Sequence, residues 1–116
     1  MSANHKPTNE DVVLVYATFP SQDEAERVGG DLVDRRIAAC VNIGPPITSL
    51  YIWKARRQRE TECVMIAKTR SALADTLVAE ITRLHPYETP AVLVLPVLGG
   101  SAAFLDWIAQ QTTHGT

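Results

Sequence analysis

Long apolar runs are absent from this sequence of 116 residues. The most continuous ones, Val12 to Ala17 and Ala91 to Val97, are far shorter than the roughly 20 residues that span a bilayer, so we expect no membrane segment. Residues 1–11 are polar and lack the apolar stretch of roughly 7 to 15 residues that a secretory signal needs. We therefore expect a cytoplasmic protein without a membrane partner, whose N-terminal tail, residues 1–11, is flexible.

An excess of charge of one sign is missing as well. The chain has 13 acidic and 11 basic residues and a net charge of -2. A nearly neutral chain has no overall electrostatic attraction to nucleic acid. We expect no nucleic-acid partner, and a binding site has to be local.

Cysteine is scarce, and Cys40 and Cys63 are the two cysteines of the chain. They lie in separate apolar runs without a close-spaced partner, which indicates neither a disulfide framework nor a zinc ligand pair. We interpret both as reduced, buried thiols. The sequence also lacks a phosphate-binding glycine loop, a dinucleotide fingerprint, a nucleophile elbow and a paired-histidine zinc motif. We therefore expect no enzymatic activity and no organic cofactor.

What the chain does have is a regular alternation of strand and helix patterns. Residues 12–18 are apolar almost without a break, which is typical of a central strand. A Ser-x-x-Glu capping box at Ser21 predicts a helix over about residues 21–35, in which Gly29-Gly30 permits close packing against a sheet. The further expected elements are strands over 37–43, 47–53, 62–68 and 92–97, a second helix that Ser71 caps and Pro86 ends, and a last short helix capped by Ser101.

The second and third strands are expected to form a long, bent hairpin. Gly44-Pro45-Pro46 interrupts the second strand, which predicts a bulge there. The charged segment Lys54 to Arg59 is expected to turn the chain back.

The order β-α-β-β-α-β predicts an α+β fold, a ferredoxin-like sandwich in which both helices lie on one face of an antiparallel sheet. We expect one domain over residues 12–112, with an extra C-terminal helix, followed by a C-terminal tail over 113–116. The first, third and fourth strands are apolar on both faces, and exposing several such side chains would forgo about 1.5 to 3 kcal/mol each. A homo-oligomer that covers the open face is therefore expected.

The stretch His85-Pro86-Tyr87-Glu88-Thr89-Pro90 has the most function-like pattern. A helix end favours a protonated imidazole at His85, and the break in the helix is expected to expose the ring. The ring either caps the last helix carbonyls or serves as a metal ligand or acid-base group. Tyr87 and Glu88 offer a phenol and a carboxylate beside it. One histidine with one carboxylate is a weak metal signal, because tight divalent sites usually join about three or four ligands.

Three charged residues of the third strand are further candidates. Lys68 is expected near a sheet end, where it holds an anion, acts as a base or simply extends its amine into solvent. Glu60 and Glu62 are expected to open this strand and to point to the same face. They either hold a hard cation together or solvate a sheet edge.

Basic and aromatic residues concentrate in the hairpin. Arg56, Arg57 and Arg59 attract phosphate or an acidic partner, or keep the hairpin tip soluble. Tyr51 and Trp53 alternate on one strand face and are interpreted as core or interface anchors in preference to a ligand cage.

Several of these segments together resemble the CutA divalent-cation-tolerance family over roughly residues 12–110. The matching segments are Ala17 to Pro20, Ile37 to Ile43, Thr48 to Trp53, Glu62 to Thr69, His85 to Pro90, and Phe104 to Ile108.

The resemblance implies a tight homotrimer, similar in architecture to PII-type signalling trimers and linked to tolerance of copper and other divalent metals, without an established catalytic activity. It places the following candidates in an intersubunit cleft: Cys40, Trp53, Glu60, Lys68 and Tyr87.

The copper ligands proposed for some members of this family fall on Ala17, Leu84 and His85, so His85 is the metal candidate that remains. The chain also departs from the family at Ala55-Arg56 and Ala91. Our leading hypothesis is a trimeric cation-tolerance protein that binds Cu²⁺ or another divalent cation weakly through His85, with Cys40 or nearby carboxylates as further candidate ligands. The alternative is a PII-like regulatory trimer that binds a small anionic ligand in its intersubunit clefts, and an unrecognised enzyme is ranked last.

Overall fold

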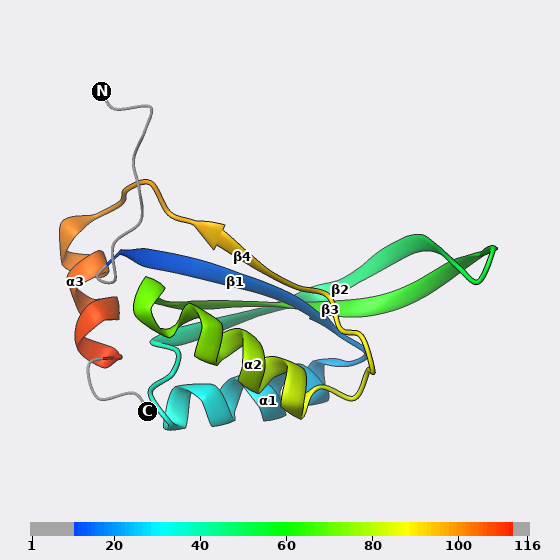
Figure 1. Ribbon diagram of the computed structural model, residues 1–116, viewed down its shortest axis with the longest axis horizontal. Helices are drawn as coiled ribbons and strands as arrows, with labels where there is room; N and C mark the ends of the chain where they lie inside the picture. The colour runs from blue at the N-terminus through cyan, green and yellow to red at the C-terminus, as the bar shows by residue number, and fades with distance from the viewer. Residues whose placement is uncertain (1–10, 113–116) are drawn as a thin grey trace.

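The computed structural model describes residues 11–112 (Figure 1). The tails expected over 1–11 and 113–116 lie outside the described residues, Asp11 excepted. The predicted β-α-β-β-α-β order with an extra C-terminal helix is confirmed. The elements are β1 (Val12–Phe19), α1 (Gln22–Asp34), β2 (Cys40–Trp53), β3 (Arg56–Arg70), a 3₁₀ turn (Ser71–Leu73), α2 (Ala74–Leu84), β4 (Val92–Pro96) and α3 (Ala102–Gln111).

The strands form one four-stranded antiparallel sheet in the order β2-β3-β1-β4. Helices α1 and α2 lie side by side against one face of this sheet, and α3 lies at one end of it (Figure 1). The far part of the β2-β3 hairpin projects beyond the helices at the opposite end. Among the described helices, none has both the length and the apolarity needed to cross a membrane.

The core lies between the helices and alternate residues of the strands. Val15, Ala17 and Phe19 of β1 are fully buried on the helix side, because successive strand residues point to opposite faces. Leu32 of α1 and Leu77 of α2 are fully buried in the same cluster. This face of the sheet is therefore covered by the helices of the same chain.

The opposite face of the sheet is apolar and open. Tyr16 of β1 is paired with Ile66 of β3 and Leu93 of β4, so these three side chains share that face. Leu93 is 61% exposed, and Leu95, two residues further along, is 42% exposed. The expectation that the first, third and fourth strands are apolar on both faces is confirmed for β1, β3 and β4.

The predicted bulge is present, since the β2-β3 register shifts between Ile43 and Pro46. The predicted turn over 54–59 is wrong, because only Lys54 and Ala55 turn the chain, with φ angles of 51° and 64°. The pairing of Trp53 with Arg56 continues the ladder almost to the tip, so the arginines lie on a strand. Charged residues fit such a strand because the projecting hairpin is exposed.

Two of the three predicted serine caps are confirmed. Ser21 Oγ accepts a hydrogen bond from the Glu24 amide over 3.2 Å, and Ser101 Oγ accepts one from the Phe104 amide over 3.4 Å. Ser71 does not cap α2, because it begins a 3₁₀ turn, and its amide donates to the Asp11 carbonyl over 2.6 Å. The turn delays the start of α2 by three residues, to Ala74.

Candidate functional site

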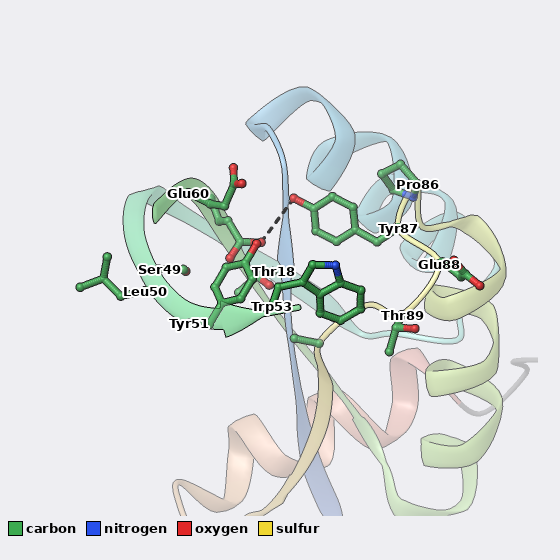
Figure 2. A pocket seen from close by; sticks show the side chains of 12 residues that line it. Thr18, Ser49, Leu50, Tyr51, Trp53, Glu60, Pro86, Tyr87, Glu88 and Thr89 are labelled. Carbon is green, nitrogen blue, oxygen red and sulfur yellow. Dashed lines mark hydrogen bonds between the residues drawn. The ribbon is translucent and has the colours of Figure 1, made fainter. Parts of the chain in front are cut away.

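A cavity of about 800 Å³ lies where the projecting hairpin faces the loop that follows α2 (Figure 2). Thr18, at the end of β1, lies between these two segments. The residues that line the cavity are Thr18, Ser49, Leu50, Tyr51, Trp53, Glu60, Glu62, Pro86, Tyr87, Glu88, Thr89 and Ala91.

The hairpin wall of this cavity is built by strand alternation. Ser49 is paired with Glu60, and Tyr51 and Trp53 follow Ser49 at two-residue steps on the same face. Glu62 lies two residues from Glu60 and shares that face, as predicted. Both glutamates lie well inside β3 and not at its start, because β3 begins at Arg56.

The loop wall is formed mainly by Tyr87. Its hydroxyl lies 3.5 Å from Glu62 Oε2, which is the outer limit of a hydrogen bond. Burial, followed by the nearby charges of Glu62 and Glu60, raises the pKa of Tyr87. Burial and the same two carboxylates also raise the pKa of Tyr51. Both phenols are therefore neutral donors in a pocket of negative potential.

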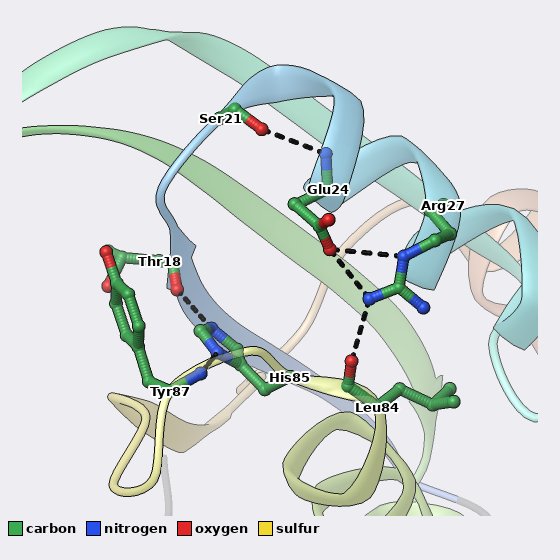
Figure 3. A network of polar contacts seen from close by, with 7 residues as sticks. All are labelled: Thr18, Ser21, Glu24, Arg27, Leu84, His85 and Tyr87. Atoms are coloured by element: carbon green, nitrogen blue, oxygen red, sulfur yellow. Dashed lines mark hydrogen bonds and ion pairs between the residues drawn. The ribbon is translucent and has the colours of Figure 1, made fainter.

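His85 lies beneath the loop and not in the open cavity (Figure 3). The residue is 8% exposed, and its ring stacks on Phe19 with 4.4 Å between the ring centroids. Nδ1 accepts a hydrogen bond from the Tyr87 amide over 3.0 Å, so this nitrogen carries no proton. Nε2 then donates to the Thr18 carbonyl oxygen over 2.7 Å. The ring is a neutral imidazole with both nitrogens bonded.

The predicted exposure of the His85 ring is therefore wrong, and so is its role as a cap of the last helix carbonyls. Pro86 ends the helix as predicted, and the backbone of His85 is extended, which directs the ring toward β1. The carbonyl of Leu84 accepts its hydrogen bond from the guanidinium of Arg27 over 2.8 Å instead (Figure 3).

His85 has no cluster of further metal ligands around it in the described part of the chain. Within residues 11–112, no group of three or more His, Cys, Asp or Glu side chains is placed to hold a metal ion. Ala17 is fully buried, and Leu84 packs against the core, so these positions offer no ligand beside His85. The carboxylates of Glu60 and Glu62 lie on one wall of the cavity, where their oxygen atoms could serve as metal ligands.

The cavity brings together three of the five predicted cleft residues: Trp53, Glu60 and Tyr87. Cys40 and Lys68 lie elsewhere, paired with each other across β2 and β3. Lys68 Nζ lies 5.2 Å from the ring centroid of Phe104, a cation-π contact with α3.

The two cysteines differ in their surroundings. Cys63 is buried as predicted, its thiol donates to the Gly44 carbonyl over 3.0 Å, and burial raises its pKa. Cys40 is partly exposed, so its predicted burial is wrong, because it begins β2 on the open face beside Lys68.

Sequence reasoning missed Thr18, Ser49 and Thr89 as pocket residues. Ser49 had a detectable signal, because it precedes Tyr51 and Trp53 at two-residue spacing. Thr18 and Thr89 enter the pocket only because β1 ends beside the loop, a relationship that depends on the tertiary fold.

The fold and the pocket define a small α+β domain with an open apolar sheet face and an acidic, aromatic cavity. The chain belongs to the CutA1 divalent ion tolerance protein family, whose model matches residues 13–111. This finding confirms the resemblance seen in the sequence.

Individual relatives agree with this assignment. Protein CutA 1, chloroplastic, from Oryza sativa subsp. japonica is 37% identical over 100 residues, which cover 86% of this chain and 56% of the rice protein. The chain thus spans about half the length of the first curated relatives that it matches. Divalent-cation tolerance protein CutA from Thermus thermophilus is 37% identical over 103 residues, which cover 89% of this chain and 98% of that protein.

A solved structure shows the same fold. The periplasmic divalent cation tolerance protein CutA from Archaeoglobus fulgidus is 39% identical, with a TM-score of 0.84 over 87% of this chain and 98% of that chain.

Proposed function

We propose that this chain acts in divalent-cation tolerance as a homotrimer that binds divalent cations weakly through the carboxylates of Glu60 and Glu62. Family membership supports the physiological role. The observation that carries the binding site is the position of these two carboxylates on one face of one cavity. Carboxylate oxygens suit hard divalent cations, and a site with so few protein ligands is weak.

The proposed site uses the glutamates in place of His85. A metal bound to the His85 ring would have to displace the Tyr87 amide or the Thr18 carbonyl from a buried nitrogen. Breaking a buried hydrogen bond of this kind costs about 1 to 3 kcal/mol. The two carboxylates need no such displacement. By the Irving–Williams order, Cu²⁺ is the divalent ion expected to bind most tightly.

The open sheet face supports the trimer. Leu93 and Leu95 are 61% and 42% exposed beside Tyr16 and Ile66, and each such side chain gains about 1.5 to 3 kcal/mol when it is fully buried. A second copy of the chain offers a matching apolar surface. The cavity lies at the hairpin end of this face, so trimer formation would place it next to a neighbouring subunit.

The test of the metal site is isothermal titration of Cu²⁺ and Zn²⁺ against the wild type and the double variant Glu60→Gln/Glu62→Gln. The double variant should lose most of the binding heat. Asp34→Asn, which removes a charge at the end of α1, is the control and should bind as the wild type does. Identical isotherms for the wild type and the double variant would show that the glutamates are not the site.

The trimer is tested separately by light scattering on the purified chain. A mass three times that of the 12.7 kDa chain supports it, and Leu93→Lys/Leu95→Lys should reduce that mass. A monomer or dimer in the wild type would contradict the proposed trimer.

The alternative of a PII-like trimer with a small anionic ligand stays a prediction. Among the described residues, no lysine or arginine lines the cavity, and Lys68 lies against Phe104. For this reason we rank cation binding first. The cytoplasmic location also stays a prediction, and the relatives from rice and Archaeoglobus fulgidus are named as chloroplastic and periplasmic proteins.

A further inference from the structure

The surroundings of His85 come from its own chain, because the residue is already buried without a neighbouring subunit. Its ring contacts the rings of Phe19 and Tyr87, with 4.4 Å and 4.8 Å between the ring centroids. Nδ1 accepts a hydrogen bond from the Tyr87 amide over 3.0 Å, and Nε2 donates one to the Thr18 carbonyl over 2.7 Å (Figure 3). One nitrogen therefore has to accept while the other donates.

This pair of hydrogen bonds can form only while the ring is neutral. A protonated imidazole has two N–H donors and no acceptor, so a proton on Nδ1 would face the N–H of Tyr87. The added charge would also be buried without a carboxylate, because backbone groups occupy both ring nitrogens. Protonation of His85 therefore opposes the position of the loop that the Tyr87 amide belongs to.

The neighbouring segments carry further titratable groups. These are Glu24 and Arg27 of α1, Glu62 and Cys63 of β3, Arg83 of α2, and Tyr87 and Glu88 of the loop. Ordinary carboxyl, phenol and guanidinium groups do not titrate between about pH 5 and 7. Burial raises the pKa of the Cys63 thiol away from this range. Histidine is the side chain whose ordinary titration range lies there.

We propose that His85 is a proton-sensitive latch of the loop over residues 85–90. The neutral ring holds this loop against the end of β1, and protonation of Nδ1 releases the Tyr87 amide and lets the loop move away. Release would also break the contact of the Tyr87 hydroxyl with Glu62 at 3.5 Å, so the latch makes the loop wall of the cavity depend on pH. The proposal does not depend on cation binding.

The direction of the pH dependence follows from the protons bound in each state. The closed loop holds a neutral ring, whereas the released ring reaches water, where an imidazole is half protonated near about pH 6.5. The open loop therefore binds more protons, and acid favours it. For one proton, each unit of pH below about 6 raises the opening constant by up to about tenfold.

The experiment is hydrogen exchange of the Tyr87 amide in the full, metal-free chain, followed by NMR and corrected for the intrinsic exchange rate. Protection should be constant above about pH 7 and fall by up to about tenfold per unit below about pH 6. The amide of Ile81, a fully buried residue of α2, is the internal control and should keep its protection. Constant protection of Tyr87 down to about pH 5, or its loss together with that of Ile81, would overturn the proposal.

Two substitutions separate the ring nitrogens. His85→Asn places an amide oxygen near the position of Nδ1, where it accepts from Tyr87 without titrating, so protection should not depend on pH. His85→Gln offers no acceptor at that position and should expose the Tyr87 amide at every pH. Circular dichroism checks that both variants fold, and the wild-type profile decides if they do not. A folded His85→Asn variant with the wild-type pH profile would place the titrating group elsewhere and overturn the proposal.

The other two histidines, His5 and His114, provide a matched control. His5→Gln/His114→Gln retains His85 and should reproduce the wild-type profile, whereas a flat profile would assign the effect to these residues and overturn the proposal. Because no metal is added, the result is separate from the Cu²⁺ titration. A pH-dependent loop without Cu²⁺ binding would remove the metal site alone, and Cu²⁺ binding with a flat profile would remove the latch alone.

Discussion

His85 Nε2 donates a hydrogen bond to the carbonyl oxygen of Thr18 over 2.7 Å. This contact joins the loop after α2 to the end of β1, across 67 residues of sequence. The other ring nitrogen accepts from the amide of Tyr87, which forms the loop wall of the cavity. His85 is therefore a positioning residue, because it fixes the loop that carries Tyr87.

His85→Ala should lower the free energy of unfolding by about 1.5 to 4.5 kcal/mol. The substitution leaves the Thr18 carbonyl without its donor, which costs about 1 to 3 kcal/mol, and removes the stack on Phe19, which contributes about 0.5 to 1.5 kcal/mol. Urea denaturation measures the change. Glu88→Ala, at an exposed position of the same loop, should change stability little. Equal effects of the two substitutions would refute the positioning role of the ring.

Gly29 and Gly30 of α1 should respond oppositely to alanine. A Cβ at Gly29 would lie 2.8 Å from Val41 Cγ2 and 3.1 Å from Met65 Sδ, whereas a Cβ at Gly30 would meet nothing within 4 Å. Gly30→Ala should stabilise the protein by up to about 1 kcal/mol through helix propensity. At Gly29 the same gain is offset by overpacking, which costs about 1 to 3 kcal/mol.

Thermal or urea denaturation of the two variants compares them directly. Gly29→Ala should be the less stable of the pair by about 1 to 3 kcal/mol. Equal stability would mean that α1 shifts away from β2 without cost. The expected close packing thus applies to one glycine of the pair.

The parts of the fold that local sequence determines were predictable. The apolar run of β1 and the capping serines at positions 21 and 101 depend on neighbouring residues, and the structure confirms them. The length of the hairpin depends on pairing between residues far apart in the chain, and a charged strand looks like a turn in the sequence. The 3₁₀ turn at Ser71 likewise follows from its contact with Asp11.

The candidate site was predictable only in part, for the same reason. The alternation of Glu60 with Glu62 and of Tyr51 with Trp53 is visible in the sequence. The surroundings of His85 are not, because Phe19 and Thr18 reach the ring from the other end of the fold. Whether a histidine is buried or exposed is a tertiary property.

The hairpin turn offers a stabilising substitution. Lys54 and Ala55 have φ angles of 51° and 64°, a left-handed conformation that costs a residue with a Cβ about 1 to 2 kcal/mol. Two-residue turns of this kind favour glycine at the second position. Ala55→Gly should therefore raise the free energy of unfolding by about 0.5 to 1 kcal/mol, measured by urea denaturation. Ala55→Val, which adds a branched side chain at the same position, should lower it, and the opposite order would contradict the turn geometry.

Glu80 should make stability depend on pH in the acid range. Its carboxylate binds Arg83 over 2.9 Å and Arg35, the residue that follows α1, over 2.6 Å, and so links α2 to the C-terminal end of α1. Hydrogen bonds from Arg83 and then Arg35 lower the pKa of Glu80 from 4.5 to about 2. Because the folded-state pKa lies below the unfolded value, the stabilisation is fully present above pH 4.5 and disappears as the pH falls toward about 2.

Glu80→Gln should accordingly be less stable than the wild type at pH 7, and the difference should shrink as the pH falls from 4.5 to about 2. Urea denaturation of both proteins across this range measures the effect. Asp106→Asn, at an exposed position of α3, is the matched control and should follow the wild type at every pH. A Glu80→Gln deficit that stays constant down to pH 2 would mean that the ion pairs do not hold the carboxylate in its charged form, and that the side chain stabilises the α1-α2 contact by packing alone.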